Sequence, residues 1–220
     1  MMKLDMHFHS NYSPDSITLP ETALKIAKKK GLTLAITEHN ITSSWPVFKK
    51  LSKEIGVEVI FGEEIKVLEE GKCVGEIVGL FLKDFVKPGP AIEVFEAIHS
   101  QAGLAMVVHP FDIFRHDFKS LEQNVKKIDL LEVFNSRTVL DSHNKKAFEF
   151  AQKNKLPMTA NSDSHSPNEI GMAYTEVKAD TLEEARRELI MSHTKLVTRK
   201  SPISVHLTTQ LAKMNLIKDK

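Results

Sequence analysis

The chain has 220 residues, 41% of them hydrophobic, and its 30 basic and 29 acidic side chains leave a formal charge of +1. This near balance argues against an extended nucleic-acid groove, which normally shows a basic excess, but it still allows a small phosphate pocket. The single cysteine, Cys73, cannot form an internal disulfide, and no run of 18 apolar residues occurs. We therefore expect a cytoplasmic protein without membrane spans.

Strands and helices alternate along most of the predicted chain. A strand over 3–8 precedes a helix from Thr18 to Lys30, with Pro20 in its first turn and Gly31 at its end. The later predicted elements are a strand at 32–37, a helix from Ser43 or Ser44 to about Ile55, strands at 57–67 and 73–82, a helix at 88–102, a strand at 103–110, a helix at 119–127, a strand at 129–134, a helix at 141–154, a strand at 156–161, a helix near 181–193 and a short strand after it.

This alternation predicts βαβ units around a parallel sheet. A closed barrel of the (β/α) type and an open doubly wound sheet both fit, and both place active sites at the carboxyl ends of their strands. We assign residues 1–200 to one domain. The tail at 201–220 alternates apolar residues through ISVHL and then becomes helix-like, so it packs on the domain or forms an oligomer contact.

Histidines and carboxylates follow the apolar strands at the end where such an enzyme would use them. His7 and His9 are two residues apart, a spacing that puts both imidazoles on one face of a strand. The ends of five further strands carry His39, Glu63 and Glu64, His109, Glu132 with Asn135, and Asp163 with His165. Any one of these histidines would more often be a core or loop residue. Their repeated position at one end of successive strands predicts a metal site instead.

A ligand set rich in histidine, with carboxylates and no cysteine, favours divalent Mn, Zn or Fe over a structural thiolate site. There are too many ligands for one tetrahedral ion, so two ions, or three, bridged by a carboxylate fit better. Such ions lower the pKa of a bound water to about 7. The chain has no G-x-S-x-G segment, and no motif surrounds Cys73. Hydrolysis by metal-bound hydroxide is therefore the expected chemistry.

The segments HFHS, TEHN, GEEI, VVHP, LEVFN and NSDSHS, in this order, resemble the motifs of the PHP (polymerase and histidinol phosphatase) superfamily. The resemblance covers about residues 3–175. It implies a distorted (β/α)7 barrel of the PHP type, a bi- or trinuclear metal centre and hydrolysis of phosphate esters.

Carried over by position, the resemblance implies that His7 and His9 bind the first metal. Glu64 fits the bridging glutamate, because the family motif reads G-x-E and Gly62 sets the register. Glu63 would then face away as an ordinary strand residue.

The same resemblance assigns His39 and His109 to the other metal positions, and Asp163 and His165 close the centre. Asp15 aligns with a place where trinuclear members often carry histidine.

Glu132 lies near another position where trinuclear members often carry histidine, and it is included as a candidate ligand. The departures from histidine at Asp15 and Glu132 favour a dinuclear centre. Asp15 is then an added ligand, an acid/base or a plain turn residue, and Asp163 or Asp15 would move the proton.

Four residues are candidates for substrate binding. A guanidinium binds phosphate through two parallel hydrogen bonds, so Arg137, directly after LEVFNS, and Arg115, after His109, are candidate phosphate contacts. Asn40 and Asn135 would position substrate or cap a turn.

The expected function is a metal-dependent phosphoesterase that hydrolyses a small phosphorylated metabolite or nucleotide. A 3′–5′ exonuclease or nucleic-acid phosphodiesterase is the alternative, because related domains accompany DNA polymerases, although the near-neutral charge disfavours it. A module in which metal only holds the fold is a third reading. Neither a membrane partner nor a particular oligomeric state is predicted.

Overall fold

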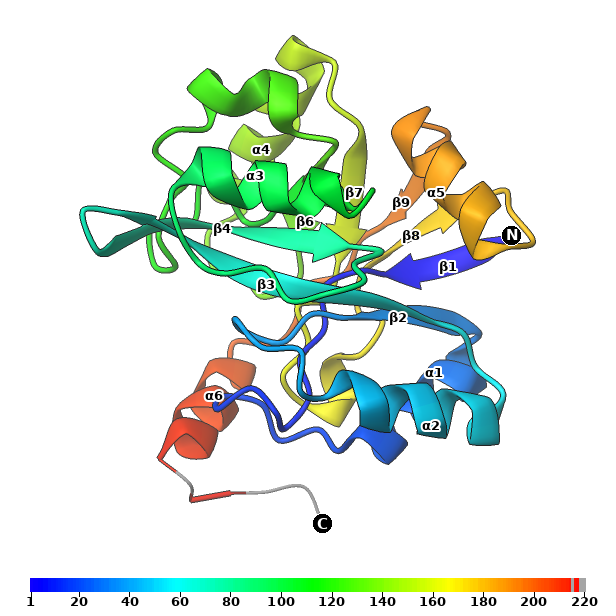
Figure 1. Cartoon of the computed structure of the whole chain (residues 1–220). Helices are drawn as coiled ribbons and strands as arrows, with labels where there is room; N and C mark the ends of the chain where they lie inside the picture. Colours follow the sequence, from blue (N-terminus) through cyan, green and yellow to red (C-terminus); the bar gives the residue numbers. More distant parts are fainter. Residues whose placement is uncertain (215, 218–220) are drawn as a thin grey trace.

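The computed structural model describes residues 1–214 and 216–217. Within them, one sheet with the strand order β7-β6-β5-β4-β3-β2-β1-β8-β9 curls into a nearly closed barrel (Figure 1). Its strands are β1 (Met2–Asp5), β2 (Leu32–Ile36), β3 (Val59–Glu69), β4 (Lys72–Leu80), β5 (Leu104–Val107), β6 (Leu130–Asn135), β7 (Met158–Asn161), β8 (Tyr174–Val177) and β9 (Thr194–Val197).

Helices cover both outer sides of this sheet. Figure 1 shows α3 and α4 on one side, α1 and α2 on the other, and α5 beside β8 and β9. The helices are α1 (Pro20–Lys30), α2 (Trp45–Ile55), α3 (Ala91–Ser100), α4 (Asp141–Asn154), α5 (Leu182–Ile190) and α6 (Val205–Lys213), with 3₁₀ turns η1 (Glu122–Lys127) and η2 (Pro167–Glu169).

The barrel closes between β1 and β7 largely through side chains. The backbone of Phe8 forms one parallel bridge with Ser164, and Met6 N–H donates to the Asn161 Oδ1 at 3.0 Å. The antiparallel pair β8 and β9 continues the sheet beyond β1. The predicted distorted barrel is thus confirmed. Its sheet is mixed rather than fully parallel, because β4 also runs antiparallel to β3 and β5.

Three apolar clusters fill the molecule. The cluster inside the barrel contains Ile60, Val78 and Met106, and Ala185 and Leu189 of α5 join it. The other two lie outside the barrel, one beneath α3 and α4 and the other beneath α1 and α2. The residues of a strand alternate between these layers, so neighbouring side chains on β3 enter different environments.

Two predicted helix starts differ from the structure. Leu19, not Thr18, precedes α1, and no side chain caps this helix. Pro20 at the first helical position has no N–H, so this helix has one fewer donor without an intrahelical partner. The helix expected at 88–102 is reduced to Ala91–Ser100 because Pro90 lies outside the helix at its start.

Three other differences concern weakly patterned segments. The helix predicted at 119–127 is only the 3₁₀ turn η1, in which no residue is buried. The sequence did not predict β8, a four-residue strand that pairs with the distant β1 and β9. In the tail, the ISVHL alternation does not form a strand, since α6 begins at Val205. Residues 215 and 218–220 of the predicted tail lie outside the described residues.

Candidate metal centre

Six strands deliver polar side chains to one end of the barrel, and all of these side chains but that of the partly exposed His39 are buried. His7 and His9 follow β1, His39 follows β2, and Glu64 lies on β3. The remaining members come from the ends of β5, β6 and β7 and from the loop after β1: His109, Glu132, Asp163, His165 and Asp15. The structure thus brings together all nine residues that the sequence nominated for the centre.

Glu64 lies between two pairs of imidazoles. Its Oε1 is 3.3 Å from His7 Nε2 and 3.2 Å from His109 Nε2. Its Oε2 is 3.3 Å from His9 Nε2 and 2.8 Å from His39 Nδ1. Each oxygen therefore faces its own pair of nitrogen ligands, which is the arrangement that a carboxylate bridging two cations needs.

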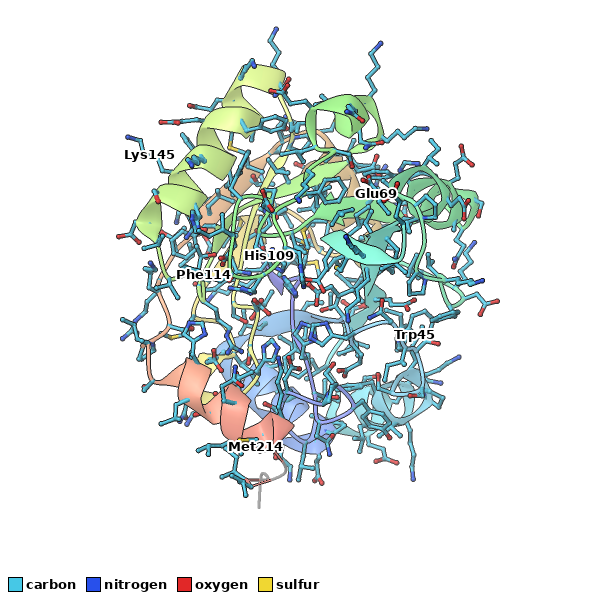
Figure 2. All side chains as sticks on the ribbon, turned by 90° about the vertical axis from the view of Figure 1, so that its left-hand side faces the viewer. Trp45, Glu69, His109, Phe114, Lys145 and Met214 are labelled. Carbon is cyan, nitrogen blue, oxygen red and sulfur yellow. The ribbon has the colours of Figure 1, made fainter. Side chains whose placement is uncertain are left out.

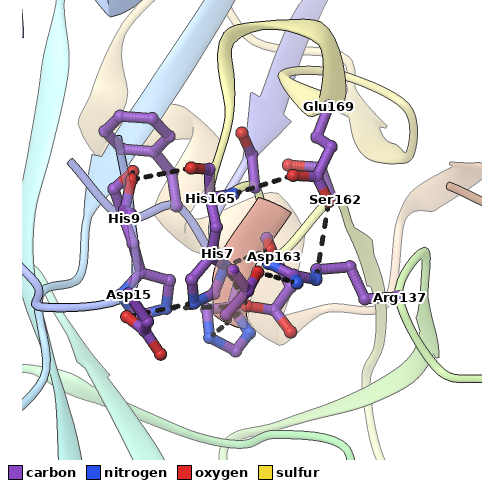
Figure 3. A network of polar contacts seen from close by, with 12 residues as sticks. His7, His9, Asp15, Arg137, Ser162, Asp163, His165 and Glu169 are labelled. Carbon is purple, nitrogen blue, oxygen red and sulfur yellow. Dashed lines mark hydrogen bonds and ion pairs between the residues drawn. The ribbon is translucent and has the colours of Figure 1, made fainter. Parts of the chain in front are cut away.

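Two aspartates complete the ring of ligand atoms. Asp163 Oδ1 is 3.5 Å from His7 Nε2 and 3.6 Å from His9 Nε2. Asp15 Oδ1 is 3.4 Å from His39 Nε2 and 3.5 Å from His165 Nε2. Figure 3 shows these carboxylates and the imidazoles of His7 and His165 gathered in one network.

Five of the ligand atoms are buried and lack hydrogen-bond partners among the described residues. They are His7 Nε2, His9 Nε2, Asp15 Oδ1, His39 Nδ1 and Glu64 Oε2. Orphaned buried polar atoms are rare in proteins, and several that converge on one point fit a cation site. Four groups of three have ligand atoms within 4.8 Å of one another: His7, Glu64 and His109; His9, His39 and His165; His7, His9 and Asp163; and His39, Glu64 and Glu76. The donor set fits divalent cations.

The charges in the centre favour cations. Burial would raise the pKa of the Glu64 carboxyl, but the neighbouring His7 and His39 outweigh it and hold that pKa well below its usual range. Burial opposes the charged form of His7 as well, yet Asp163 and Glu64 raise its pKa. Burial and the charges of His39 and His165 lower the pKa of His9 to about 3, which leaves a neutral ligand. Divalent ions would replace protons in this acidic cluster.

Glu132 lies behind the ligands rather than among them. Its Oε1 is 3.1 Å from His7 Nδ1 and accepts a hydrogen bond from Asn161 at 3.0 Å. Its Oε2 accepts from the His109 backbone N–H at 2.8 Å and from Asn135 at 2.9 Å. Each oxygen thus already has two hydrogen-bond partners, which is typical of a residue that orients a metal ligand. The ligand role of Glu132 stays a prediction.

The backbone is strained at two of the strand ends. His109 has φ 31° and Asp163 has φ 52°, values that non-glycine residues seldom adopt. Such strain persists only where the surrounding contacts overdetermine it, as at functional sites.

The four candidate substrate residues occupy different positions. Arg115 donates to the Asp163 carboxylate and, at 3.2 Å, to Asn135 Oδ1, and both Arg115 and Arg137 line the cavity. Asn135 is buried and also donates to Asp163 at 3.1 Å. Asn40 Oδ1 accepts the Lys66 backbone N–H at 2.9 Å, and Asn40 is not among the residues that border the cavity. Its two predicted roles stay predictions.

Sequence reasoning missed several buried acids around the centre. Glu76 on β4 borders the cavity with its carboxylate 3.8 Å from His109 Nε2. Glu38 accepts hydrogen bonds from Ser10 and Ser13, and burial raises its pKa to about 7. Asp112 holds Arg115 at 3.3 Å. Glu76 and Asp112 lie outside the six motifs. Glu38 lies beside His39 in TEHN, so this motif could have indicated it.

The cavity over this centre has a volume of about 400 Å³. Besides the metal-binding side chains, its walls include Phe114, Val139 and four residues of α6. Within the part of the chain that the structure describes, no helix is both long and apolar enough to cross a membrane.

Comparisons with known proteins show which family and which proteins this chain is similar to. A family model described as PHP-associated matches residues 141–190. The chain is 41% identical over 149 residues to the uncharacterised protein MJ1587 of Methanocaldococcus jannaschii, covering 61% of this chain and 82% of that one. It is 33% identical over 190 residues to MJ0417 of the same organism, covering 83% and 73%. The chain belongs to the PHP superfamily.

More distant similarities concern a part of the relative or the fold alone. A probable histidinol-phosphatase of Clostridium acetobutylicum is 32% identical over 127 residues, which is 43% of this chain and 49% of that protein. A two-domain protein of Bacteroides vulgatus containing a predicted PHP-like metal-dependent phosphoesterase superposes with a TM-score of 0.73 at 20% identity, over 90% of this chain and 65% of that one. The lesion-specific endonuclease PfuEndoQ of Pyrococcus furiosus gives 0.63 at 19% identity, over 100% and 72%.

Proposed function

We propose that this protein is a metal-dependent hydrolase of phosphoric esters that acts on a small phosphorylated metabolite or nucleotide. The observation that carries the proposal is Glu64, whose two oxygens each face a separate pair of imidazoles. A bridged pair of cations is typical of sites that displace groups on phosphorus. The phosphoesterase and histidinol-phosphatase similarities support this reaction class.

His7 and His109 would hold one ion, and His9 and His39 the other, with Glu64 between them. Asp163 Oδ1 lies near one member of each pair, His7 and His9, while Asp15 and His165 offer a further set of ligands beside His39. The bound ions would supply positive charge for the phosphate oxygens and lower the pKa of a water nucleophile.

Two guanidinium groups at the cavity would orient the phosphate. Arg137 has its Nη1 buried without a hydrogen-bond partner among the described residues, and its Nε lies 3.4 Å from Glu169 (Figure 3). Arg115 also borders the cavity and donates a hydrogen bond to the Asp163 carboxylate. Planar donors of this kind match the tetrahedral oxygens of phosphate and resist deprotonation.

Asp163 and Asp15 are the candidates for moving the proton of the leaving group. Burial would raise the pKa of the Asp163 carboxyl, but His7, Arg115 and His165 outweigh it and keep that pKa well below its usual range. Burial opposes ionisation of Asp15 as well, and His165 and His39 again lower its pKa. Both Asp15 and Asp163 border the cavity, so either carboxylate can contact the departing oxygen.

The proposal is tested by release of inorganic phosphate. The purified protein, loaded in turn with Mn²⁺, Zn²⁺ and Fe²⁺, is incubated with p-nitrophenyl phosphate and with panels of nucleotides and sugar phosphates, and elemental analysis counts the bound ions. We expect turnover that a chelator abolishes. A labelled single-stranded oligonucleotide in the same assay examines the nuclease alternative. Absence of phosphate release with every metal and every ester would contradict the proposal.

A further inference from the structure

Helix α6 forms one wall of the cavity over the metal centre. Four of its residues border the cavity at positions i, i+3, i+4 and i+7, a spacing that places them on one face of an α-helix. They are His206, Thr209, Gln210 and Lys213. This polar face lies outside the six motifs that the sequence analysis used.

The wall is fixed to the barrel by its buried side. Val205 and Ala212 are buried, and the buried Thr209 hydroxyl accepts a hydrogen bond from the Arg137 guanidinium. The segment leading to α6 is also held, since the Ser201 N–H donates to the Ser136 carbonyl at 2.9 Å. The helix therefore has a defined position beside the site.

Two residues on the cavity face of α6 are free to bind a ligand. Gln210 is exposed, and its amide makes no hydrogen bond to any described residue. Lys213 Nζ lies 3.5 Å from Asp15 Oδ2, and its side chain is 50% exposed. An ion pair with so much contact with water is weak, so a polar group of a substrate can take the place of Asp15.

An apolar side chain borders the same cavity from a different loop. Phe114 lies on the loop after β5, and Figure 2 shows this loop above α6 on the same side of the molecule. Phe114 is 66% exposed, and its ring lies 6.2 Å from that of His143 between centroids. A large exposed aromatic ring at the mouth of a polar site offers a flat surface to a ligand.

We propose that α6 is the wall that recognises the leaving group of the substrate. Gln210 and Lys213 bind hydroxyl or anionic groups along one edge of the alcohol part, and Phe114 contacts its apolar face. This inference rests on the proposed function and names its substrate class: monoesters of compact ring-bearing alcohols such as sugars or nucleosides. A cavity of about 400 Å³ holds a molecule of this size.

The test compares the full-length protein with the double variant Gln210→Ala/Lys213→Ala and with Phe114→Ala. Leu207→Ala is the matched control, because Leu207 lies on α6 but does not border the cavity. KM and kcat are measured for adenosine monophosphate, glucose 6-phosphate and methyl phosphate, together with the inhibition constant of inorganic phosphate.

We expect the double variant to raise KM about tenfold for whichever of the two larger esters is hydrolysed, the loss typical of a hydrogen bond to a charged group. Its kcat, its KM for methyl phosphate and its phosphate inhibition should stay within about twofold, and Leu207→Ala should change nothing. Equal losses for methyl phosphate and inorganic phosphate would overturn the inference, because α6 would then act on the phosphate itself. Unchanged KM values would overturn it as well.

A binding measurement separates this inference from the proposed function. Calorimetry compares inorganic phosphate with the phosphonate analogue of adenosine monophosphate, in which a methylene group replaces the ester oxygen. If the wild type hydrolyses no ester, the proposed function fails, whereas weaker binding of the phosphonate alone by the double variant still supports recognition by α6. If the double variant binds both ligands as the wild type does, the inference fails even in an active enzyme.

Discussion

Glu63 and Glu64 are neighbours on β3, yet they enter opposite layers of the barrel. Glu64 points inward among four imidazoles. Glu63 points outward toward the apolar cluster beneath α3, where its Oε2 accepts the Val86 N–H at 2.9 Å and its Oε1 has no hydrogen-bond partner among the described residues. Burial raises the pKa of Glu63 to about 7, while the imidazoles hold that of Glu64 well below its usual range.

The comparison teaches that burial alone does not decide how a carboxyl behaves. Both side chains are almost inaccessible to water, at 0% and 1% exposed. Desolvation disfavours the charge of each, and only the partners differ. The sequence prediction placed Glu63 away from the centre, which agrees with the structure, but it described an ordinary strand residue and not a buried acid.

The largest expected effect follows from removing the inner carboxylate. Glu64→Ala takes away the one group shared by both imidazole pairs, so we expect phosphoesterase activity to fall on the order of 10³-fold or more. Elemental analysis should show fewer bound ions in the same sample. Glu63→Gln is the matched control on the same strand and should keep its metal content and turnover. Full activity of Glu64→Ala would remove the basis of the comparison.

A smaller effect is expected behind the ligands. Glu132→Gln places an amide N–H₂ where the carboxylate now accepts four hydrogen bonds, which loosens the orientation of His7. We expect metal affinity or turnover to fall about 10- to 100-fold, the range seen when groups that orient metal ligands are replaced. Metal titration followed by calorimetry measures it. A loss as large as that of Glu64→Ala would mean that Glu132 itself binds an ion.

Removing the metal tests the ligands around Glu64 without a mutation. Cations that bind only the folded chain stabilise it by about 3 kcal/mol at 100 times their dissociation constant. We therefore expect a chelator to lower the melting temperature by several degrees while far-ultraviolet circular dichroism stays unchanged at 25 °C. Added metal should restore both stability and activity. Complete unfolding on chelation would instead favour a purely structural role for the ions.

The smallest expected effect concerns Glu63, which points outward from the barrel. The pKa of Glu63 in the folded chain, about 7, lies above its ordinary 4.5, so the unfolded state loses this proton first. The contribution of Glu63 to stability is thus complete below about pH 4.5, falls as the pH rises toward 7 and is constant above. Glu63→Gln should reduce the loss of unfolding free energy between pH 4.5 and 8 by on the order of 1–3 kcal/mol. Urea unfolding over this pH range measures it. An identical slope in both proteins would contradict the assignment.

Much of the centre could be predicted because its residues are local signals. His7 and His9 share a face through the two-residue period of an extended segment. Glu64 was chosen over Glu63 by the resemblance, whose motif reads G-x-E from Gly62. The helix over Asp141–Asn154 also agrees with its prediction. The contributions of Glu76 and α6 could not be found in this way, because they depend on which distant elements border one cavity.

The sequence by itself determined the alternation of elements and the chemical character of the strand ends, because strand period and turn residues act over a few positions. The choice of a barrel over an open sheet came from the resemblance to the PHP superfamily. Only the tertiary structure decided that Glu132 lies behind His7, that Glu63 is a buried acid, and that α6 stands beside the site. These features depend on distances between residues far apart in the chain, such as Arg137 and Thr209, which are set by packing and not by local pattern.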